Sequence, residues 1–397
     1  MNDLRIERED FGQLFISLKK RGYRLIGPAV ANDAIIYDDL NTPEDLPIGW
    51  TDVQEAASYR IQRRDDKALF GYNVGPHSWK QFLFPPRKLL WRGQKTESGG
   101  FEPVVIQDHG IQGYGIQDQE LTRYAFIGVR ACELHAIHIQ DKVFMGGAHQ
   151  DSTYAGRRED NFIVAVNCSQ AANTCFCTSM NTGPKVGEGY DLALTEIISE
   201  DAHYFVTQAG SEKGAAVLSE ISTQTANSID LKKAAACTEK AKAEMGRRID
   251  ITDIKELLYR NYNNAQWQAL EERCLACGNC TMACPTCFCS KVDDVTDLTG
   301  EHAERWRSWD SCFTMDFSYL HGGSVRASTK SRYRHWLTHK LATWLDQFGS
   351  SGCVGCGRCI TWCPVGIDLT AEVKAIRDSE GSENSNEREH ETEVTDG

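Results

Sequence analysis

The chain has 397 residues, of which 41% are hydrophobic and 25% charged, and its formal net charge is −13. This composition predicts a soluble protein with enough apolar material for two or three domains. The acidic balance argues against general nucleic-acid binding, which needs a basic surface. The sequence has no run of about 18 apolar residues that could span a membrane. The charged N-terminus MNDLRIERED lacks the apolar stretch of a signal peptide, so we expect a cytoplasmic protein.

The first part of the chain, residues 1–245, is predicted to form a mixed α/β domain. Residues 10–28, DFGQLFISLKKRGYRLIGP, indicate an amphipathic helix, a turn at Gly22 and a short strand. Two further strands are predicted in the segments DLALTEI (191–197) and HYFVTQA (203–209).

A strand, a helix and a strand are predicted in the middle of this domain. The segments are YAFIGV (124–129), ELHAIHIQDKVF (133–144) and NFIVAV (161–166). This order is typical of a βαβ unit with parallel strands. Cys132 follows the first strand and Cys168 the second, and the carboxyl ends of parallel strands share one edge of a sheet. We therefore expect these two cysteines to lie close together.

The segment VNCSQAANTCFCTSM (166–180) adds Cys175 and Cys177, which are two residues apart and so share one side of an extended backbone. Together with Cys132 and Cys168 they are candidate ligands of a third [4Fe–4S] cluster. Two alternatives remain open. The four cysteines could be small buried hydrophobic residues, or they could include a redox thiol pair.

The strongest signal is an internal repeat of the pattern C-x2-C-G-x-C-x3-C-P, which is the run found in two-cluster ferredoxins. In a reducing cytoplasm, clustered cysteines indicate metal or redox chemistry rather than disulfides. The two copies are CLACGNCTMACP and CVGCGRCITWCP, and their cysteines are Cys274, Cys277, Cys280 and Cys284, then Cys353, Cys356, Cys359 and Cys363.

Each run predicts a loop that surrounds one iron–sulfur cubane with three thiolates. Gly278 and Gly357 allow the tight backbone path, which lets loop N–H groups point at sulfur. The fourth cysteine is expected at the start of a helix, with proline in the first turn, and therefore to bind the other cluster. We assign Cys274, Cys277, Cys280 and Cys363 to the first cluster, and Cys353, Cys356, Cys359 and Cys284 to the second. A zinc site, which uses four ligands in all, is the alternative.

Residues 246–376 are expected to form an α-helical ferredoxin-like domain. ITDIKELLYRNYNNAQWQALEE precedes the first run, and HAERWRSWDSCF and SRYRHWLTHKLATWLDQF, which lie between the runs, are also predicted to be helical. Residues 377–397 are polar and acidic and are predicted to be a disordered tail. The predicted fold class is thus α+β, with the cluster domain after the α/β domain.

Three cysteines and a group of basic residues remain. Cys287, Cys289 and Cys312 could pack around the clusters, act as extra or replacement ligands, or take part in disulfide chemistry. A basic, tryptophan-rich region could offset the negative charge of the clusters, dock an acidic partner or be a solvated face. Its residues are Arg305, Arg307, Arg332, Arg334 and Lys340.

At this point the sequence resembles the β subunits of cytoplasmic NiFe hydrogenases of the sulfhydrogenase type and the related A subunits of anaerobic sulfite reductases. The segments that carry the resemblance are FLFPPRKLL, GVRACELHAI, NTCFCTSMNTGP, CLACGNCTMACPTCFC, WDSCF and CVGCGRCITWCP. The resemblance implies a 4Fe–4S electron-transfer subunit of an oxidoreductase complex. Such a subunit would relay electrons between a flavin-bearing, NAD(P)H-using partner and a partner with a NiFe or sirohaem centre.

No catalytic residue is assigned to this chain. It has no Walker A motif, and GIQGYG (110–115) lacks the order and context of a dinucleotide fingerprint, so we expect neither nucleotide nor flavin here. The C-x2-C pairs of a NiFe site are also missing. Two other functions remain as alternatives. One is a stand-alone thiol–disulfide reductase, and the other is an iron–sulfur sensor that binds nucleic acid, which the acidic body disfavours.

Overall fold

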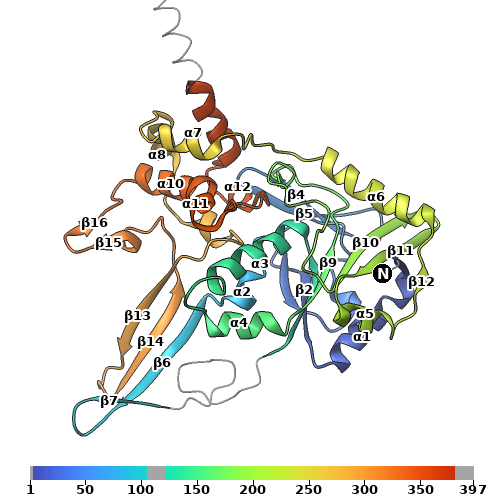
Figure 1. Cartoon of the computed structure of the whole chain (residues 1–397), viewed down its shortest axis with the longest axis horizontal. Helices are drawn as coiled ribbons and strands as arrows, with labels where there is room; N and C mark the ends of the chain where they lie inside the picture. The colour runs from blue at the N-terminus through green and yellow to red at the C-terminus, as the bar shows by residue number, and fades with distance from the viewer. Residues whose placement is uncertain (1–2, 105–121, 381–397) are drawn as a thin grey trace, which may run out of the picture.

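The computed structural model describes residues 3–104 and 122–380 (Figure 1). The segment GIQGYG and residues 381–397 of the predicted tail lie outside the described residues. Within the described part, no helix is long and apolar enough to cross a membrane.

An eight-stranded mixed sheet is the centre of the N-terminal part. Its strands are β1 (Leu4–Glu7), β2 (Arg24–Ala31), β3 (Ala34–Asp39), β8 (Tyr124–Val129), β9 (Phe162–Val166), β10 (Leu192–Ser199), β11 (Ala202–Ala209) and β12 (Gln224–Thr225). They lie in the order β12-β1-β11-β10-β9-β8-β2-β3. The four middle strands, β10, β9, β8 and β2, are parallel, and the outer pairs are antiparallel. β8, β9, β10 and β11 lie where the sequence predicted strands.

Both faces of this sheet are buried, which explains the nearly continuous apolar runs of β8 and β9. On one face, Ile127 and Val164 pack with α1 (Gly12–Lys20) and α5 (Glu212–Leu218). The other face packs against α2 (Lys80–Leu83), α3 (Ala131–Phe144) and α4 (Ser152–Glu159). The connection from β8 to its parallel neighbour β9 runs through α3 and α4. α6 (Ser228–Ala243) lies over β10 and β11.

A second, four-stranded antiparallel sheet projects from the body as an arm (Figure 1). It has the order β13-β14-β6-β7, with β6 (Arg87–Lys95), β7 (Phe101–Pro103), β13 (Ser290–Thr296) and β14 (His302–Trp309). The prediction of a helix in HAERWRSWDSCF is therefore wrong. These residues form a strand because they pair with β6, which is about 200 residues away in the sequence, and such long-range pairing overrides local propensity.

The C-terminal part consists mainly of helices. They are α7 (Ile254–Arg260), α8 (Gln266–Arg273), α9 (Asn279–Met282), α10 (Thr329–Thr338), α11 (Trp344–Phe348), α12 (Arg358–Thr361) and a helix over 369–380. The helix predicted in SRYRHWLTHKLATWLDQF is confirmed, and a π-helical turn, His339–Thr343, separates α10 from α11. Two hairpins complete the described fold, β4 (Trp50–Glu55) with β5 (Ser58–Arg63), and β15 (Tyr319–Leu320) with β16 (Gly323–Ser324).

The first residues of the predicted tail are ordered. Residues 377–380 complete the last helix, where Arg377 forms an ion pair with Asp253 at 2.8 Å and Glu380 pairs with Arg260. The prediction of disorder is therefore wrong for these four residues, because ion pairs with α7 and the residue before it hold the end of the helix.

Candidate metal centre

The two cysteine runs repeat one backbone conformation. Gly278 and Gly357 have φ values of 76° and 77°, each directly before a short helix, α9 or α12. A Cβ atom at Gly357 would lie 2.4 Å from the carbonyl oxygen of Thr174, so this position also requires glycine for space. The tight path predicted at these two glycines is confirmed.

Backbone amides point at sulfur in both runs. The N–H of Ala276 donates to Cys274 Sγ at 3.5 Å, and the N–H of Gly355 donates to Cys353 Sγ at 3.4 Å. Ala276 and Gly355 occupy the same place in the repeat and have left-handed φ values of 52° and 64°. An alanine in this conformation is uncommon, and it keeps the loop open around the thiols.

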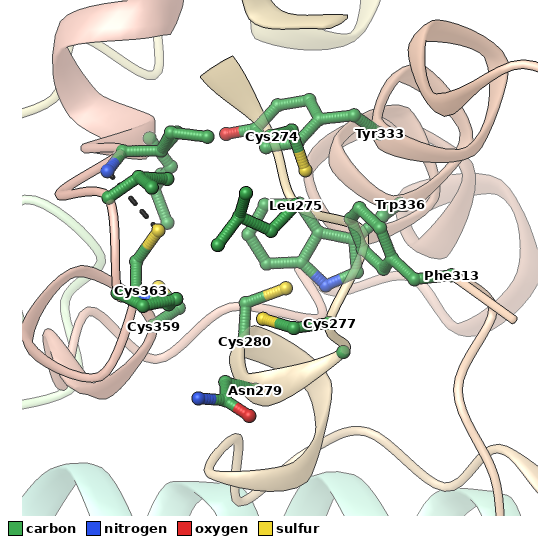
Figure 2. A pocket seen from close by; sticks show the side chains of 15 residues that line it. Cys274, Leu275, Cys277, Asn279, Cys280, Phe313, Tyr333, Trp336, Cys359 and Cys363 are labelled. Atoms are coloured by element: carbon green, nitrogen blue, oxygen red, sulfur yellow. Dashed lines mark hydrogen bonds between the residues drawn. The ribbon is translucent and has the colours of Figure 1, made fainter.

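The first cysteine group consists of Cys274, Cys277, Cys280 and Cys363, which line one cavity (Figure 2). The N–H of Ile367 donates to Cys363 Sγ at 3.3 Å, the bond drawn dashed in Figure 2. The other lining side chains are largely apolar, namely Leu275, Phe313, Tyr333, Trp336, Val365, Ile367 and Leu369. Cys277 is exposed, so this group lies close to the surface.

The second group consists of Cys284, Cys353, Cys356 and Cys359. Burial raises the pKa of Cys353 to about 12, and the nearby thiols of Cys356 and Cys284 add to this rise. Burial also raises the pKa of Cys359, with further contributions from the other three. The fourth cysteine of the first run thus lies with the first three cysteines of the second run, and Cys363 lies with the first group.

The fourth cysteine of each run lies with the other group, but the reason predicted for this, a helix that starts at the fourth cysteine, is wrong. No helix begins at either C-P pair: residues 285–289 are irregular and lead into β13, and Pro364 precedes the helix over 369–380 by five residues. The exchange instead depends on how the two loops pack. α9 and α12 lie against each other, and the side-chain amide of Asn279 donates to the carbonyl oxygen of Trp362 at 3.3 Å.

The third group consists of Cys132, Cys168, Cys175 and Cys177, which line another cavity together with Cys356 of the second group. Cys132 is in the first turn of α3, and Cys168 follows β9. The Cys175–Cys177 loop is held by the N–H of Phe176, which donates to the carbonyl oxygen of Gly355 at 2.9 Å. The cysteines at two adjacent strand ends and those of the CFC loop thus surround one space.

A bulge in β8 brings a buried cation to this cavity. The register shifts at Gly128, whose φ is 90°, and the strand then leads directly to Arg130. The guanidinium of Arg130 is 1% exposed and donates to the carbonyl oxygens of Phe70 at 2.7 Å and Tyr72 at 2.9 Å. Its positive charge lowers the pKa of Cys168, although burial has the larger, opposite effect.

The chemistry of these donor sets fits iron–sulfur clusters. Burial raises the pKa of Cys175 to about 12 and that of Cys132 well above its usual value, so neither thiol ionises readily without a cation. A cubane distributes its thiolates over separate irons, whereas a zinc ion gathers its ligands at one point. Among residues 3–104 and 122–380, no three or more Cys, His, Asp or Glu side chains are arranged to hold a single ion.

Cys287, Cys289 and Cys312 form two hydrogen-bonded contacts near the second group. Cys287 forms a hydrogen bond with Cys284, and this contact lowers the pKa of Cys284 well below its usual value despite burial. Cys289 and Cys312 form a second hydrogen-bonded pair, in which Cys289 has its pKa lowered to about 7. Cys287 and Cys289 are therefore packed beside the second group, and Cys312 is also close to Cys280 of the first.

The five basic residues considered together in the sequence separate in the structure. Arg305 and Arg307 are on β14 of the arm, where they pair with Asp294 and Asp151. Lys340, in contrast, is 4% exposed and donates to Cys284 Sγ at 3.1 Å. Lys80 is a second buried lysine, and it could not be predicted because nothing in FLFPPRKLL or its flanks marks a lysine that contacts a loop 204 residues away.

The comparisons with known proteins concern the cysteine runs and the chain as a whole. Residues 273–367 match the family model of a 4Fe-4S dicluster domain. The chain is 27% identical over 381 residues to "Sulfhydrogenase 2 subunit beta" of Pyrococcus furiosus, an alignment that covers 95% of this chain and 99% of the relative. No solved structure matches the chain significantly. The resemblance predicted from the motifs is confirmed, because the chain is similar to a sulfhydrogenase β subunit over nearly its whole length, and the comparisons support an iron–sulfur electron-transfer role.

Proposed function

We propose that this chain is the electron-relay subunit of a cytoplasmic hydrogenase complex and that it holds three [4Fe–4S] clusters. The first cluster would be held by Cys274, Cys277, Cys280 and Cys363, the second by Cys284, Cys353, Cys356 and Cys359, and the third by Cys132, Cys168, Cys175 and Cys177. Each cluster, when bound, supplies a site for one-electron transfer.

The observation that carries this proposal is that the three groups form a row. Cys359 of the second group also lines the cavity of the first group. Cys356 of the second group also lines the cavity of the third. Consecutive groups thus share lining residues, and the second group is in the middle. A row of adjacent one-electron sites is the arrangement that an electron relay requires.

The surface near the first group supports a docking role at that end of the row. Cys277 is exposed, and Leu275, Met282 and Val365 present 63%, 37% and 40% of their surface to solvent. Exposed apolar residues around a buried redox site favour contact with another protein. We expect one partner, with a flavin and NAD(P)H site or with a NiFe or sirohaem centre, at this end and the other partner near the third group.

The test is the iron and acid-labile sulfide content of the anaerobically reconstituted chain. Three cubanes require about 12 irons per chain and two require about 8. A Cys175→Ser/Cys177→Ser double variant should lose about four irons. Cys237→Ser is the matched control and should lose none, because Cys237 on α6 is half-buried and interacts with Cys168 but does not line the cavity of the third group. Equal iron contents of about 8 in wild type and double variant would reject the third cluster.

A stand-alone thiol–disulfide reductase is the second candidate, and the Cys289–Cys312 contact is the observation that favours it. In that case the two thiols would pass two electrons and two protons to a disulfide substrate, which would leave as two thiols, and would themselves form a disulfide. Two one-electron transfers from the clusters and two protons would restore the thiols, and the chain alone would turn over the substrate. Differential alkylation and mass spectrometry of the oxidised holoprotein would detect the bond. Two free thiols after oxidation, with no turnover by the isolated chain, would eliminate this candidate.

A further inference from the structure

The first and second cysteine groups differ in the cations around them. The first group has a largely apolar wall and an exposed cysteine. Burial raises the pKa of its Cys274, and the positive charge of Arg332 opposes this rise only weakly. The guanidinium of Arg332 donates to the carbonyl oxygen of Ala327 at 3.1 Å and to Thr329 Oγ1 at 3.2 Å, rather than to a cysteine sulfur.

At the second group a buried ammonium contacts sulfur directly. Lys340 Nζ donates to Cys284 Sγ at 3.1 Å, to Thr286 Oγ1 at 3.1 Å and to the carbonyl oxygen of Gly352 at 3.2 Å. These three acceptors account for its three protons. None of the hydrogen bonds that Lys340 makes within the described residues goes to a carboxylate, so its charge is directed at the thiolates.

The backbone is adapted to place this lysine. Lys340 is in the π-helical turn His339–Thr343 between α10 and α11. Such turns are rare and occur frequently at functional sites. The carbonyl oxygen of Lys340 accepts a hydrogen bond from the N–H of Gly352 at 2.8 Å, which ties the turn to the residue before Cys353. The lysine is thus fixed between the two cysteine runs.

A second cation supports the same side of the group. Lys80 is 4% exposed, and its Nζ donates to the carbonyl oxygens of Cys284 at 3.1 Å and Cys287 at 3.0 Å. Its ammonium also lies 3.9 Å from the centre of the Trp309 ring. The guanidinium of Arg358 also acts on this group, because its charge and hydrogen bond lower the pKa of Cys356, but it is paired with the buried carboxylate of Glu133. The lysines therefore supply the uncompensated positive charge.

We propose that Lys340 makes the second group a more readily reduced cluster site than the first, so that an electron that enters at the first group moves toward the middle of the row. This inference rests on the proposed assignment of the cysteines to clusters. Reduction adds one negative charge, and a fixed cation at hydrogen-bond distance in a dry interior stabilises the reduced form more than the oxidised form. Within the described residues, no lysine or arginine forms a hydrogen bond with a cysteine sulfur of the first site, so this site should have the lower potential.

The test is a potentiometric titration of the reconstituted full chain, followed by EPR. Cys284→Ser changes a ligand of the second group and so identifies its signal. In wild type this signal should appear at a higher potential than the signal of the first group. In Lys340→Met its midpoint should fall by at least about 59 mV, which is a tenfold change in the ratio of reduced to oxidised sites for one electron. The midpoint of the first group should not move.

Three further variants distinguish charge from structure. Lys340→Gln removes the charge but keeps a donor, and should lower the midpoint as Met does. Lys340→Arg retains the charge and should retain most of the wild-type potential. Lys142→Met removes an exposed lysine that bonds Ser350 at 2.9 Å and should change nothing.

The outcomes separate this inference from the proposed function. Normal iron content with an unchanged midpoint in Lys340→Met and Lys340→Gln would overturn the role of Lys340 and leave the relay intact. Loss of about four irons in both variants would show that the lysine is needed to hold the cluster, and would also overturn its role as a potential-setting residue. Absence of any cubane signal in reduced wild type would instead refute the proposed function.

Discussion

The eight-stranded sheet and the helical region around α7 to α12 have different kinds of core. The core between the sheet and α1 contains aliphatic and aromatic residues such as Phe15, Ile127 and Leu194, and none of its described members is a cysteine. The core of the helical region includes eight cysteines, two buried and six partly buried. The first core excludes water by its own apolar packing, whereas the second is complete only when its thiols are ligated.

Three kinds of contact join the two regions. β6 pairs with β14 in the arm, Phe176 bonds the second cysteine run, and Arg358 forms a buried ion pair with Glu133 of α3. The third cysteine group lies at this junction, because Cys356 from one region lines a cavity with four cysteines from the other. Perturbing each region separately, and then the contacts between them, tests whether the two cores differ in this way.

Removal of the clusters by anaerobic chelation should have the largest effect. Metal binding supplies on the order of 10 kcal/mol of folding free energy in small metal-dependent domains. We therefore expect α8 and α10 to lose nearly all of their amide-exchange protection, while β8 and β9 keep theirs. Hydrogen exchange with mass spectrometry measures the protection of the helices and of the strands in one sample. Equal losses in the sheet and in the helices would contradict the difference between the two cores.

Glu133→Gln tests the junction. The carboxylate of Glu133 accepts from Tyr37 Oη at 2.6 Å and from Trp79 Nε1 at 3.0 Å, and it pairs with the fully buried Arg358. Without the carboxylate the guanidinium remains buried and uncompensated, so the free energy of unfolding should fall by about 3–5 kcal/mol.

Anaerobic urea unfolding of the holoprotein measures this loss. Glu7→Gln, at a half-exposed pair with Arg5, is the control and should cost less than about 1 kcal/mol. A loss at Glu133 no larger than the loss at Glu7 would show that the buried pair does not join the two regions.

A matched pair of cavity variants sharpens the comparison of the cores. Leu194 in the sheet and Leu337 in the helical region are both 0% exposed. Each truncation to alanine should cost about 3 kcal/mol in the holoprotein. Only Leu337→Ala should also lower the iron content, because Leu337 packs in the core that contains the cysteines. Iron loss in Leu194→Ala as well would indicate that the two cores unfold as one unit.

The smallest effect is expected at Arg247. Its guanidinium pairs with Asp368 at 2.6 Å and with Glu55 at 3.4 Å, and its side chain is 28% exposed. Solvent screens such pairs, so Arg247→Ala should lower the free energy of unfolding by about 1 kcal/mol or less and leave the iron content unchanged. A thermal melt of the holoprotein checks this. A loss above about 2 kcal/mol would mean that this surface contact, too, joins the regions.

Local patterns predicted much of this molecule. The apolar runs at 124–129 and 161–166 predicted strands, because buried parallel strands need such residues on both faces. The helical period of residues 331–348 predicted α10 and α11. The prediction failed at His302–Trp309, where pairing with the distant β6 decided the conformation. It also failed after Cys284, where no helix follows.

The sequence by itself determined the two cysteine runs, since their spacing and the left-handed turns at their glycines are local features, although Thr174 also restricts the space at Gly357. It also placed Cys132 and Cys168 at adjacent strand ends, because strand topology follows from the order of the elements. Only the tertiary structure brought the Cys175–Cys177 loop against Gly355 and buried Lys340 against Cys284. These contacts join segments between 56 and nearly 180 residues apart, and no local pattern encodes packing over such separations.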